Sequence, residues 1–149
     1  MKALIKAIIL IVVITIIVFF SYFNNTRLIN PVTVRYYEEL KQTLTQRGYK
    51  DQLLVICTKR NKWINEILVK VGDAAPDSRH LNGEALDFLV FDVNSDGRIN
   101  SRDVDVVYQI LDNEILKNSG GVGTYKKQGL LSKQMVHIDC RGYKARWNR

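Results

Sequence analysis

A single apolar run near the N-terminus constrains this chain more than any other feature of its sequence. The run contains 17 residues, from Ala7 to Phe23, and is interrupted only by a threonine and a serine. As an α-helix it would be about 25 Å long, close to the shortest length that spans the hydrocarbon core of a bilayer. We therefore expect residues 1–23 to be a transmembrane helix that anchors the chain, residues 24–30 a polar linker and residues 31–149 one folded domain.

The flanks of the run indicate how the chain is oriented. Lys2 and Lys6 precede it and Arg27 is the single basic residue soon after it, so the positive-inside rule places the domain outside the cytoplasm. A cleaved signal peptide is the alternative, but its cleavage site requires small residues where this chain has large aromatic ones between Phe19 and Phe23. We therefore expect an uncleaved anchor and a membrane-anchored, extracytoplasmic domain.

The net charge of +7 is concentrated at the C-terminal end. Residues 1–116 contain 14 basic and 14 acidic side chains, whereas residues 117–149 contain eight basic side chains and a single acidic one, Asp139. A basic end favours anionic partners such as lipid headgroups or acidic wall polymers. Nucleic acid is not expected as a partner, because the domain is extracytoplasmic and the sequence contains no motif that reads DNA.

Hydrophobic periodicity predicts both helices and strands in the domain. The predicted helices cover residues 34–47, 63–71 and 103–117, the predicted strands cover 52–57, 85–91 and 135–140, and residues 73–82 and 119–123 are expected to be loop and flexible turn. Because strands and helices are mixed without strict alternation, we expect an α+β fold with a small mixed sheet and flanking helices.

The two cysteines, Cys57 and Cys140, leave two alternatives open. They form one disulfide in an oxidising compartment, or they are two buried thiols. Neither belongs to a C-x-x-C pair, so a zinc site made of cysteines is not expected.

An acidic residue inside an apolar strand is the first sign of a metal site. Asp87 lies within the predicted strand 85–91, and an unpaired buried carboxylate is costly, so a metal ion or an arginine is expected opposite it. The two histidines of the chain are His80, shortly before this strand, and His137, which shares a strand face with Asp139. Two histidines and one aspartate are a suitable set of three protein ligands for catalytic Zn²⁺.

The same residues carry a resemblance to a known family. The motif S-R-H-x-x-G-x-A-x-D ends at Asp87, and G-G-V-G-x-Y and V-H-I-D follow it. This pattern resembles the D-alanyl-D-alanine carboxypeptidase and murein endopeptidase family of zinc peptidases, whose fold is shared by the hedgehog signalling domain. The resemblance implies that His80, Asp87 and His137 bind zinc and, through a looser match, that Arg60 binds a substrate carboxylate.

The function that the resemblance implies is cleavage of the stem peptides of peptidoglycan. We expect a zinc metallopeptidase of the D-Ala-D-Ala carboxypeptidase type, acting as a carboxypeptidase or an endopeptidase. Many family members have an acidic general base three residues before the last histidine, where this chain has Gln134. Asp139 is therefore the candidate base, or else it only orients His137 or pairs with Arg141 or Arg146. Because of Gln134, a non-catalytic module that binds wall or protein ligands is the alternative function.

A second metal site is predicted directly after the Asp87 strand. A twelve-residue calcium loop uses oxygen ligands at loop positions 1, 3, 5, 7, 9 and 12 and a glycine at position 6. Residues 92–103 match this pattern with Asp92, Asn94, Asp96, the backbone carbonyl of Arg98, Asn100 and Asp103 as ligands and Gly97 at the turn. The loop resembles a dockerin loop, but it is single and follows a strand, so we expect a structural Ca²⁺ ion. A solvated turn without calcium is the alternative.

Overall fold

The computed structural model describes residues 5, 7–15, 29–72, 74–126 and 134–149. Within the apolar run, residues 7–15 are helical. The rest of the expected anchor and most of the expected linker lie outside the described residues. No helix within the described ranges is long and apolar enough to cross a membrane.

One mixed sheet organises the described part of the domain, which confirms the predicted α+β class. Its strands are β1 (Leu53–Cys57), β2 (Ala85–Val90), β3 (Gly121–Tyr125), β4 (Met135–Asp139) and β5 (Ala145–Asn148). The spatial order is β1-β2-β4-β3-β5, and all neighbouring pairs are antiparallel except β3 and β5, which are parallel. Strands far apart in the sequence are thereby brought together at the centre of the sheet.

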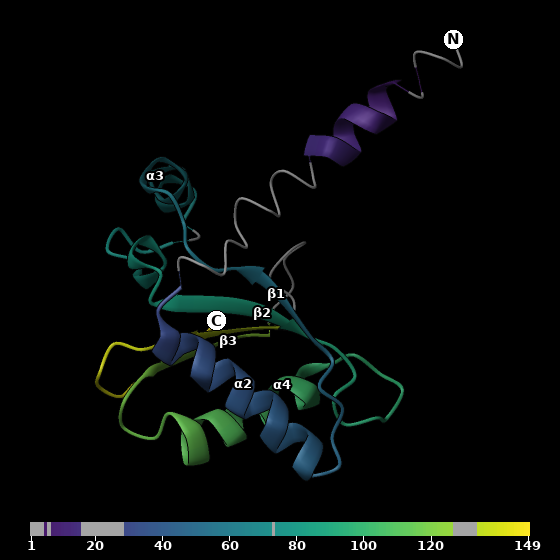
Figure 1. Cartoon of the computed structure of the whole chain (residues 1–149), viewed down its shortest axis with the longest axis vertical. Helices are drawn as coiled ribbons and strands as arrows, with labels where there is room; N and C mark the ends of the chain where they lie inside the picture. Colours follow the sequence, from purple (N-terminus) through teal and green to yellow (C-terminus); the bar gives the residue numbers. More distant parts are fainter. Residues whose placement is uncertain (1–4, 6, 16–28, 73, 127–133) are drawn as a thin grey trace.

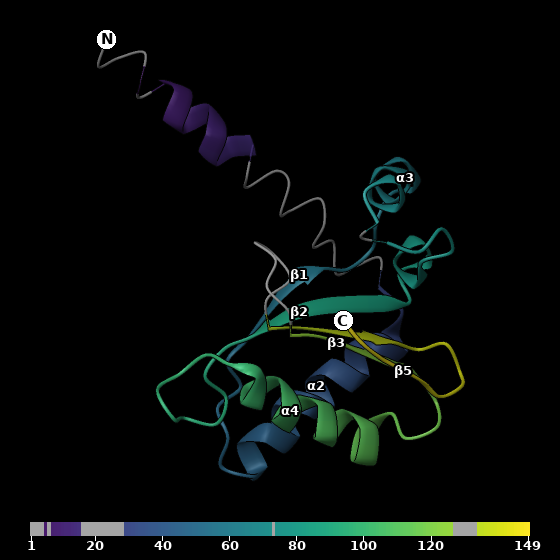
Figure 2. The same cartoon turned by 180° about the vertical axis from the view of Figure 1, so that it is seen from behind.

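Helices cover one face of this sheet and enclose the apolar core. In both views α2 (Pro31–Gln46) and α4 (Ser101–Ile110) lie on the same side of the strands (Figures 1 and 2). α4 continues into a π-helical turn, η3 (Leu111–Ile115), so the predicted helix over 103–117 is present in two parts. The largest fully buried apolar side chains between these layers include Leu40, Leu44, Phe88, Ile110, Leu111, Leu116 and Ile138.

The start of α2 follows from its first residues. The Asn30 side chain accepts a hydrogen bond from the Val32 backbone N–H, and Pro31 occupies the first helical position, where it costs no hydrogen bond. Tyr36, Leu40 and Leu44 then recur at intervals of four and are all buried. The predicted helix over 34–47 is therefore confirmed, with its start three residues earlier.

Two shorter elements lie on the opposite side of the sheet from α2 and α4. They are α3 (Lys62–Lys70), which matches the predicted helix over 63–71, and the 3₁₀ turn η2 (Arg79–Asn82) (Figure 1). The segment expected to be loop over 73–82 thus contains one helical turn. Gly83 ends this turn in the left-handed conformation, with φ of 70°, which glycine adopts without steric cost.

The glycine-rich segment over 119–123 is not the flexible turn expected from its composition. Gly121 begins β3, an inner strand, and Gly123 lies in its middle. A Cβ atom on Gly121 would overlap the Asp139 carboxylate, and one on Gly123 would overlap the Trp147 indole. These glycines are therefore required for close approach and not for a turn.

Candidate metal centre

A row of paired residues crosses all five strands at one level of the sheet. Cys57, Asp87, His137, Gly123 and Trp147 are successive partners in the strand registers from β1 to β5. Paired residues project from the same face of a sheet, and this face is the one opposite the apolar core. The row is the base on which the candidate site is built.

Three donor groups converge on this face. Asp87 Oδ2 lies 3.1 Å from His80 Nε2, Asp87 Oδ1 lies 2.7 Å from His137 Nδ1, and the two ring nitrogens are 3.3 Å apart. His80 reaches the sheet from η2, and all three residues are at least nine-tenths buried. The fold therefore brings together the three residues that the sequence singles out as metal ligands.

The other ring nitrogen of His80 is held by the backbone. His80 Nδ1 lies 2.5 Å from the carbonyl oxygen of Thr58, and this nitrogen donates the hydrogen bond because a carbonyl can only accept. In the neutral ring Nε2 then carries a lone pair, directed toward Asp87. This is the arrangement in which metal-binding histidines are usually found.

His137 is held in the same manner by a side chain. Its Nε2 lies 3.1 Å from Asp139 Oδ2, and donation to this carboxylate leaves Nδ1 free to face Asp87. Asp139 is fully buried and also accepts hydrogen bonds from Arg141. The structure thus places Asp139 behind His137, on the side of the ring away from Asp87, in contact with Arg141 and not with Arg146.

Mutual attraction determines the charges of His80 and Asp87. Burial by itself lowers the pKa of His80 and raises the pKa of Asp87, because a low dielectric penalises both charged forms. These effects of burial are outweighed: Asp87 raises the pKa of His80 to about 10, and His80 and His137 together hold the pKa of Asp87 well below its usual range. The buried carboxylate stays ionised and needs a positive charge beside it, which a proton or a metal cation can supply.

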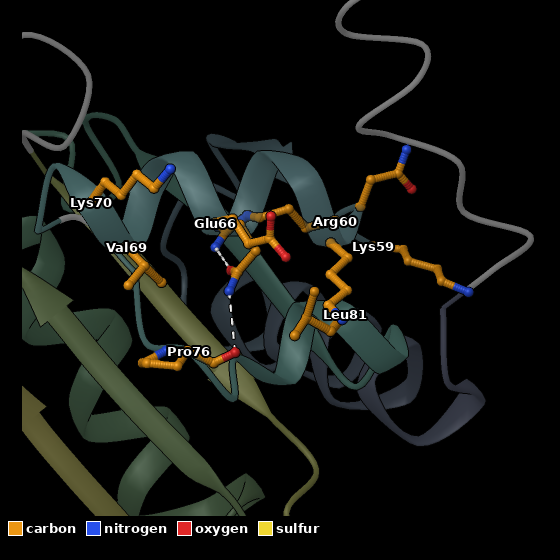
Figure 3. Close-up of a pocket in the computed structure, with 10 residues that line it drawn as sticks. Lys59, Arg60, Glu66, Val69, Lys70, Pro76 and Leu81 are labelled. Carbon is orange, nitrogen blue, oxygen red and sulfur yellow. Dashed lines mark hydrogen bonds between the residues drawn. The ribbon is translucent and has the colours of Figure 1, made fainter.

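Arg60 lies at the edge of the donor set. Its Nη2 is 3.7 Å from Asp87 Oδ2, and its Nη1 donates a hydrogen bond to Asn65 Oδ1 at 3.1 Å. The Arg60 Nε atom is buried and has no hydrogen-bond partner within the described part of the chain. Arg60 also lines a cavity of about 600 Å³ between α3 and η2 (Figure 3). The guanidinium is therefore near Asp87 and has one donor to spare.

Cys57 contacts the site at a position that the sequence did not indicate. Both cysteines are free thiols, and Cys57 is buried. Cys57, His80 and Asp87 offer donor atoms that all lie within 4.8 Å of one another. The thiol faces His80 Nδ1 at 3.6 Å, however, whereas Asp87 faces Nε2 of the same ring. One ion cannot use both sides of an imidazole ring, so Cys57 and His137 are competing third donors, and only His137 shares the Nε2 side.

The donor set of His80, Asp87 and His137 fits a zinc ion. Adjacent ligands of tetrahedral zinc are about 3.4 Å apart when the metal–nitrogen distance is about 2.1 Å. The two ring nitrogens are 3.3 Å apart and Asp87 Oδ2 is 3.1 Å from His80 Nε2, which is close to this value. The other Asp87 oxygen, Oδ1, lies 2.7 Å from His137 Nδ1. Two imidazoles, each held by a second partner, and a carboxylate are also the chemistry of a catalytic zinc site.

Trp147 and Tyr125 complete the face beside His137 and were not found from the sequence. The Trp147 ring lies 5.2 Å from the His137 ring, and its Nε1 donates a hydrogen bond to the Tyr125 hydroxyl at 3.2 Å. β5, which carries Trp147, has only four residues and no apolar alternation that would mark it. The sequence feature that could have pointed to Trp147 is the pair of glycines on β3, because they leave space for a large side chain on a neighbouring strand.

Gln134 lies just before β4, at the position where many family members have an acidic base. It is buried with φ of 60°, and its Oε1 has no hydrogen-bond partner among the described residues. The carboxylates that contact His137 within the described chain are those of Asp87 and Asp139.

The predicted calcium loop adopts a folded turn with internal hydrogen bonds. The Asp92, Asn94 and Asp96 side chains accept bonds from the backbone of Gly97, Asp96 and Arg98, and Asp103 accepts from Asn94 and Asn100. Gly97 has φ of 76°, as the sharp turn requires. Asp92 Oδ1 is buried without a hydrogen-bond partner in the described chain.

The fold and the donor set together define an α+β protein with a candidate metal centre on one sheet face. A family model described as peptidoglycan L,D-endopeptidase MepK matches residues 20–147. The chain therefore belongs to the M15 family of zinc peptidases that act on murein. The crystal structure of the Serratia marcescens L-Ala D-Glu endopeptidase ChiX is similar, with 20% sequence identity and a TM-score of 0.48 over 78% of this chain and 83% of that chain. No curated protein sequence matches the chain.

Proposed function

We propose that this peptidoglycan peptidase is a zinc-dependent endopeptidase that cuts within the stem peptide. Family membership supports the peptidase activity and the substrate class. The matched family model is described as an L,D-endopeptidase, which favours internal cleavage over the D-Ala-D-Ala carboxypeptidase type expected from the sequence motifs. The observation that carries zinc dependence is the convergence of three buried residues, each of which places a ligand atom within 3.3 Å of a ligand atom of the other two.

His80, Asp87 and His137 would hold the ion through Nε2, a carboxylate oxygen and Nδ1. Bound zinc supplies a Lewis acid and lowers the pKa of a coordinated water to about 7. The chain's own contribution is to keep both imidazoles in the required tautomer, through the Thr58 carbonyl and the Asp139 carboxylate. Burial of the donors excludes bulk water from the ligands themselves.

Of the two roles considered for Asp139, we propose that it orients His137. Its Oδ1 accepts hydrogen bonds from the Gly121 and Arg141 backbone N–H groups and from Arg141 Nε, and its Oδ2 from Arg141 Nη2 and His137. These bonds lower the pKa of Asp139 well below its usual range, against the effect of burial. A carboxylate that is so strongly stabilised as the anion is a poor proton acceptor.

Arg60 is proposed to bind a carboxylate or carbonyl oxygen of the substrate. Its position near Asp87 and its place in the lining of the cavity between α3 and η2 support this role. An arginine at this place can stabilise negative charge that develops on the substrate next to the metal.

We further propose the membrane attachment and the calcium site that the sequence predicts. The apolar run supports residues 1–23 as the anchor, residues 24–30 as linker and residues 31–149 as an extracytoplasmic domain. Two features support a structural Ca²⁺ ion: the spacing of oxygen ligands over residues 92–103, and the buried Asp92 Oδ1, which has no hydrogen-bond partner among the described residues.

Digestion of purified peptidoglycan tests the proposed reaction. The full chain in detergent, loaded with zinc, should release products whose masses correspond to cuts within the stem peptide, and chelation should stop the reaction. Loss of only a terminal D-alanine would instead assign the carboxypeptidase reaction. Binding to peptidoglycan without any cleavage would favour the non-catalytic module, for which Gln134 is the supporting feature.

A further inference from the structure

We propose that Arg141 is a positioning residue that fixes the His137 ring from two directions, through Asp139 and through Trp147. This inference rests on the proposed zinc site, because His137 matters as one of its ligands. Arg141 itself touches none of the three donor residues.

The first route runs through the Asp139 carboxylate. Arg141 Nε donates to Asp139 Oδ1 at 2.7 Å and Arg141 Nη2 donates to Oδ2 at 2.5 Å. The Arg141 backbone N–H adds a third bond to Oδ1 at 3.2 Å. A bidentate pair of this kind fixes the plane of the carboxylate, because the guanidinium presents its donors in a rigid fork.

The orientation of this carboxylate determines the orientation of His137. Asp139 Oδ2, the oxygen that Arg141 Nη2 contacts, also accepts the bond from His137 Nε2 at 3.1 Å. Asp139 has no exposed surface, so water cannot replace a lost partner without entering the sheet face. If the fork is removed, the backbone N–H groups of Gly121 and Arg141 still bond Oδ1, but Oδ2 keeps only its bond from His137. The direction of that bond is then fixed less firmly.

The second route runs through the Trp147 indole. The Arg141 guanidinium lies 5.2 Å from the Trp147 ring and 5.6 Å from the Tyr143 ring, which is the range of cation–π contacts. Trp147 in turn lies 5.2 Å from the His137 ring and takes the space that Gly123 leaves. The guanidinium therefore covers the indole that borders the imidazole.

Both routes depend on the shape of the guanidinium and not only on its charge. Lysine retains the charge and can form one bond to Asp139, but it cannot form the bidentate pair. Glutamine loses both the charge and the fork. The inference therefore predicts a graded order, with arginine best, lysine intermediate and glutamine worst.

Zinc affinity and the tautomer of His137 test the inference on the full chain. The variants are Arg141→Lys and Arg141→Gln, with Arg47→Gln as the control, because Arg47 pairs with Glu114 in an exposed ion pair. Arg141→Gln should weaken zinc binding about 10–100-fold in a competition assay with a chelating dye, as expected when the hydrogen-bond partner of a metal ligand is no longer held in place. Arg141→Lys should recover part of this loss, and Arg47→Gln should match the wild type.

The second measurement is made on the zinc-free protein. Nitrogen-15 NMR of the histidine rings at alkaline pH should show His137 protonated at Nε2 in the wild type and a mixture of tautomers in Arg141→Gln. Unchanged zinc affinity together with an unchanged tautomer in Arg141→Gln would overturn the inference. If Arg141→Gln does not fold, the same comparison is made with Arg141→Lys, and equality with the wild type in both readouts overturns it.

These readouts separate the inference from the proposed function. A wild-type protein that binds no zinc would contradict the proposed zinc site. The NMR comparison would still decide whether Arg141 orients His137.

Discussion

Asp87 and His137 face each other directly across two antiparallel strands, and His137 Nδ1 lies 2.7 Å from Asp87 Oδ1. Both side chains project from the sheet face opposite the core. Their neighbours on the same two strands, Phe88 and Val136, project from the other face and are fully buried in the apolar core. One pair of strands therefore provides the floor of the candidate site and part of the core. Substitutions in these strands have to be tested for folding as well as for metal binding.

Replacement of His137 by alanine should abolish stoichiometric zinc binding. The variant loses one of three donors, and within the described residues it leaves Asp87 with His80 and the more distant Arg60 as cationic neighbours. Elemental analysis of the purified full chain measures the zinc content, and circular dichroism checks that the variant is folded. A folded His137→Ala protein with one tightly bound zinc per chain would contradict the proposed ligand set.

Replacement of Cys57 by serine should leave zinc binding intact. The thiol faces His80 Nδ1, which already donates to the Thr58 carbonyl, and not the Nε2 side on which the other donors converge. Titration with a zinc-sensitive dye should therefore give the same affinity for Cys57→Ser and the wild type. A large loss of affinity would identify Cys57 as a ligand in place of His137.

Replacement of Asp139 by asparagine separates its two possible roles. If Asp139 orients His137, the variant should bind zinc about 10–100-fold more weakly, because the second partner of a ligand is altered. If Asp139 is instead the general base, turnover on peptidoglycan fragments should fall by about 10²–10⁴ while zinc affinity stays constant. We expect the first outcome. Gln134→Ala serves as the comparison and should affect zinc affinity little.

Replacement of Gly123 by alanine should destabilise the fold through its contact with Trp147. The added methyl group would overlap the indole ring, and overpacking of this kind costs about 1–3 kcal/mol. The change is measured as a lower melting temperature. In a double-mutant cycle with Trp147→Ala, the double variant should be destabilised by less than the sum of the two single effects, because the clash is absent once the indole is removed. Additive effects would show that Gly123 is needed for another reason.

Calcium should stabilise the fold if residues 92–103 bind it. A ligand that binds only the native state at a hundredfold excess over its Kd adds about 2.7 kcal/mol to the free energy of unfolding. After treatment with a chelator, millimolar calcium should raise the melting temperature of the wild type and of the control Asp105→Ala, which alters a carboxylate on α4. The double variant Asp92→Ala, Asp96→Ala should show no rise. No change in the wild type would leave the loop as a turn that needs no ion.

Local patterns in the sequence were sufficient to predict most of the elements and the donor residues. Alternation along β4 correctly places His137 and Asp139 on one face and Val136 and Ile138 on the other, because side chains in a strand alternate with a period of two. An ionisable residue in an apolar strand, such as Asp87, also signals by itself that a partner must exist. These properties depend on neighbours in the chain and can be read without knowing the fold.

Only the tertiary structure decided which atoms of these residues meet. The register of five strands brings Cys57 to His80 Nδ1 and Trp147 to the His137 ring. It also places two glycines, which were expected to form a flexible turn, in an inner strand with closely packed neighbours. It also places Asp139 behind His137, within the fork of Arg141. Sequence spacing determines which face of a strand a residue occupies. Which ring nitrogen of a histidine faces which partner, and which side chains pack together, depends on strands that are distant in the chain. The order of those strands is determined by the burial of the whole core.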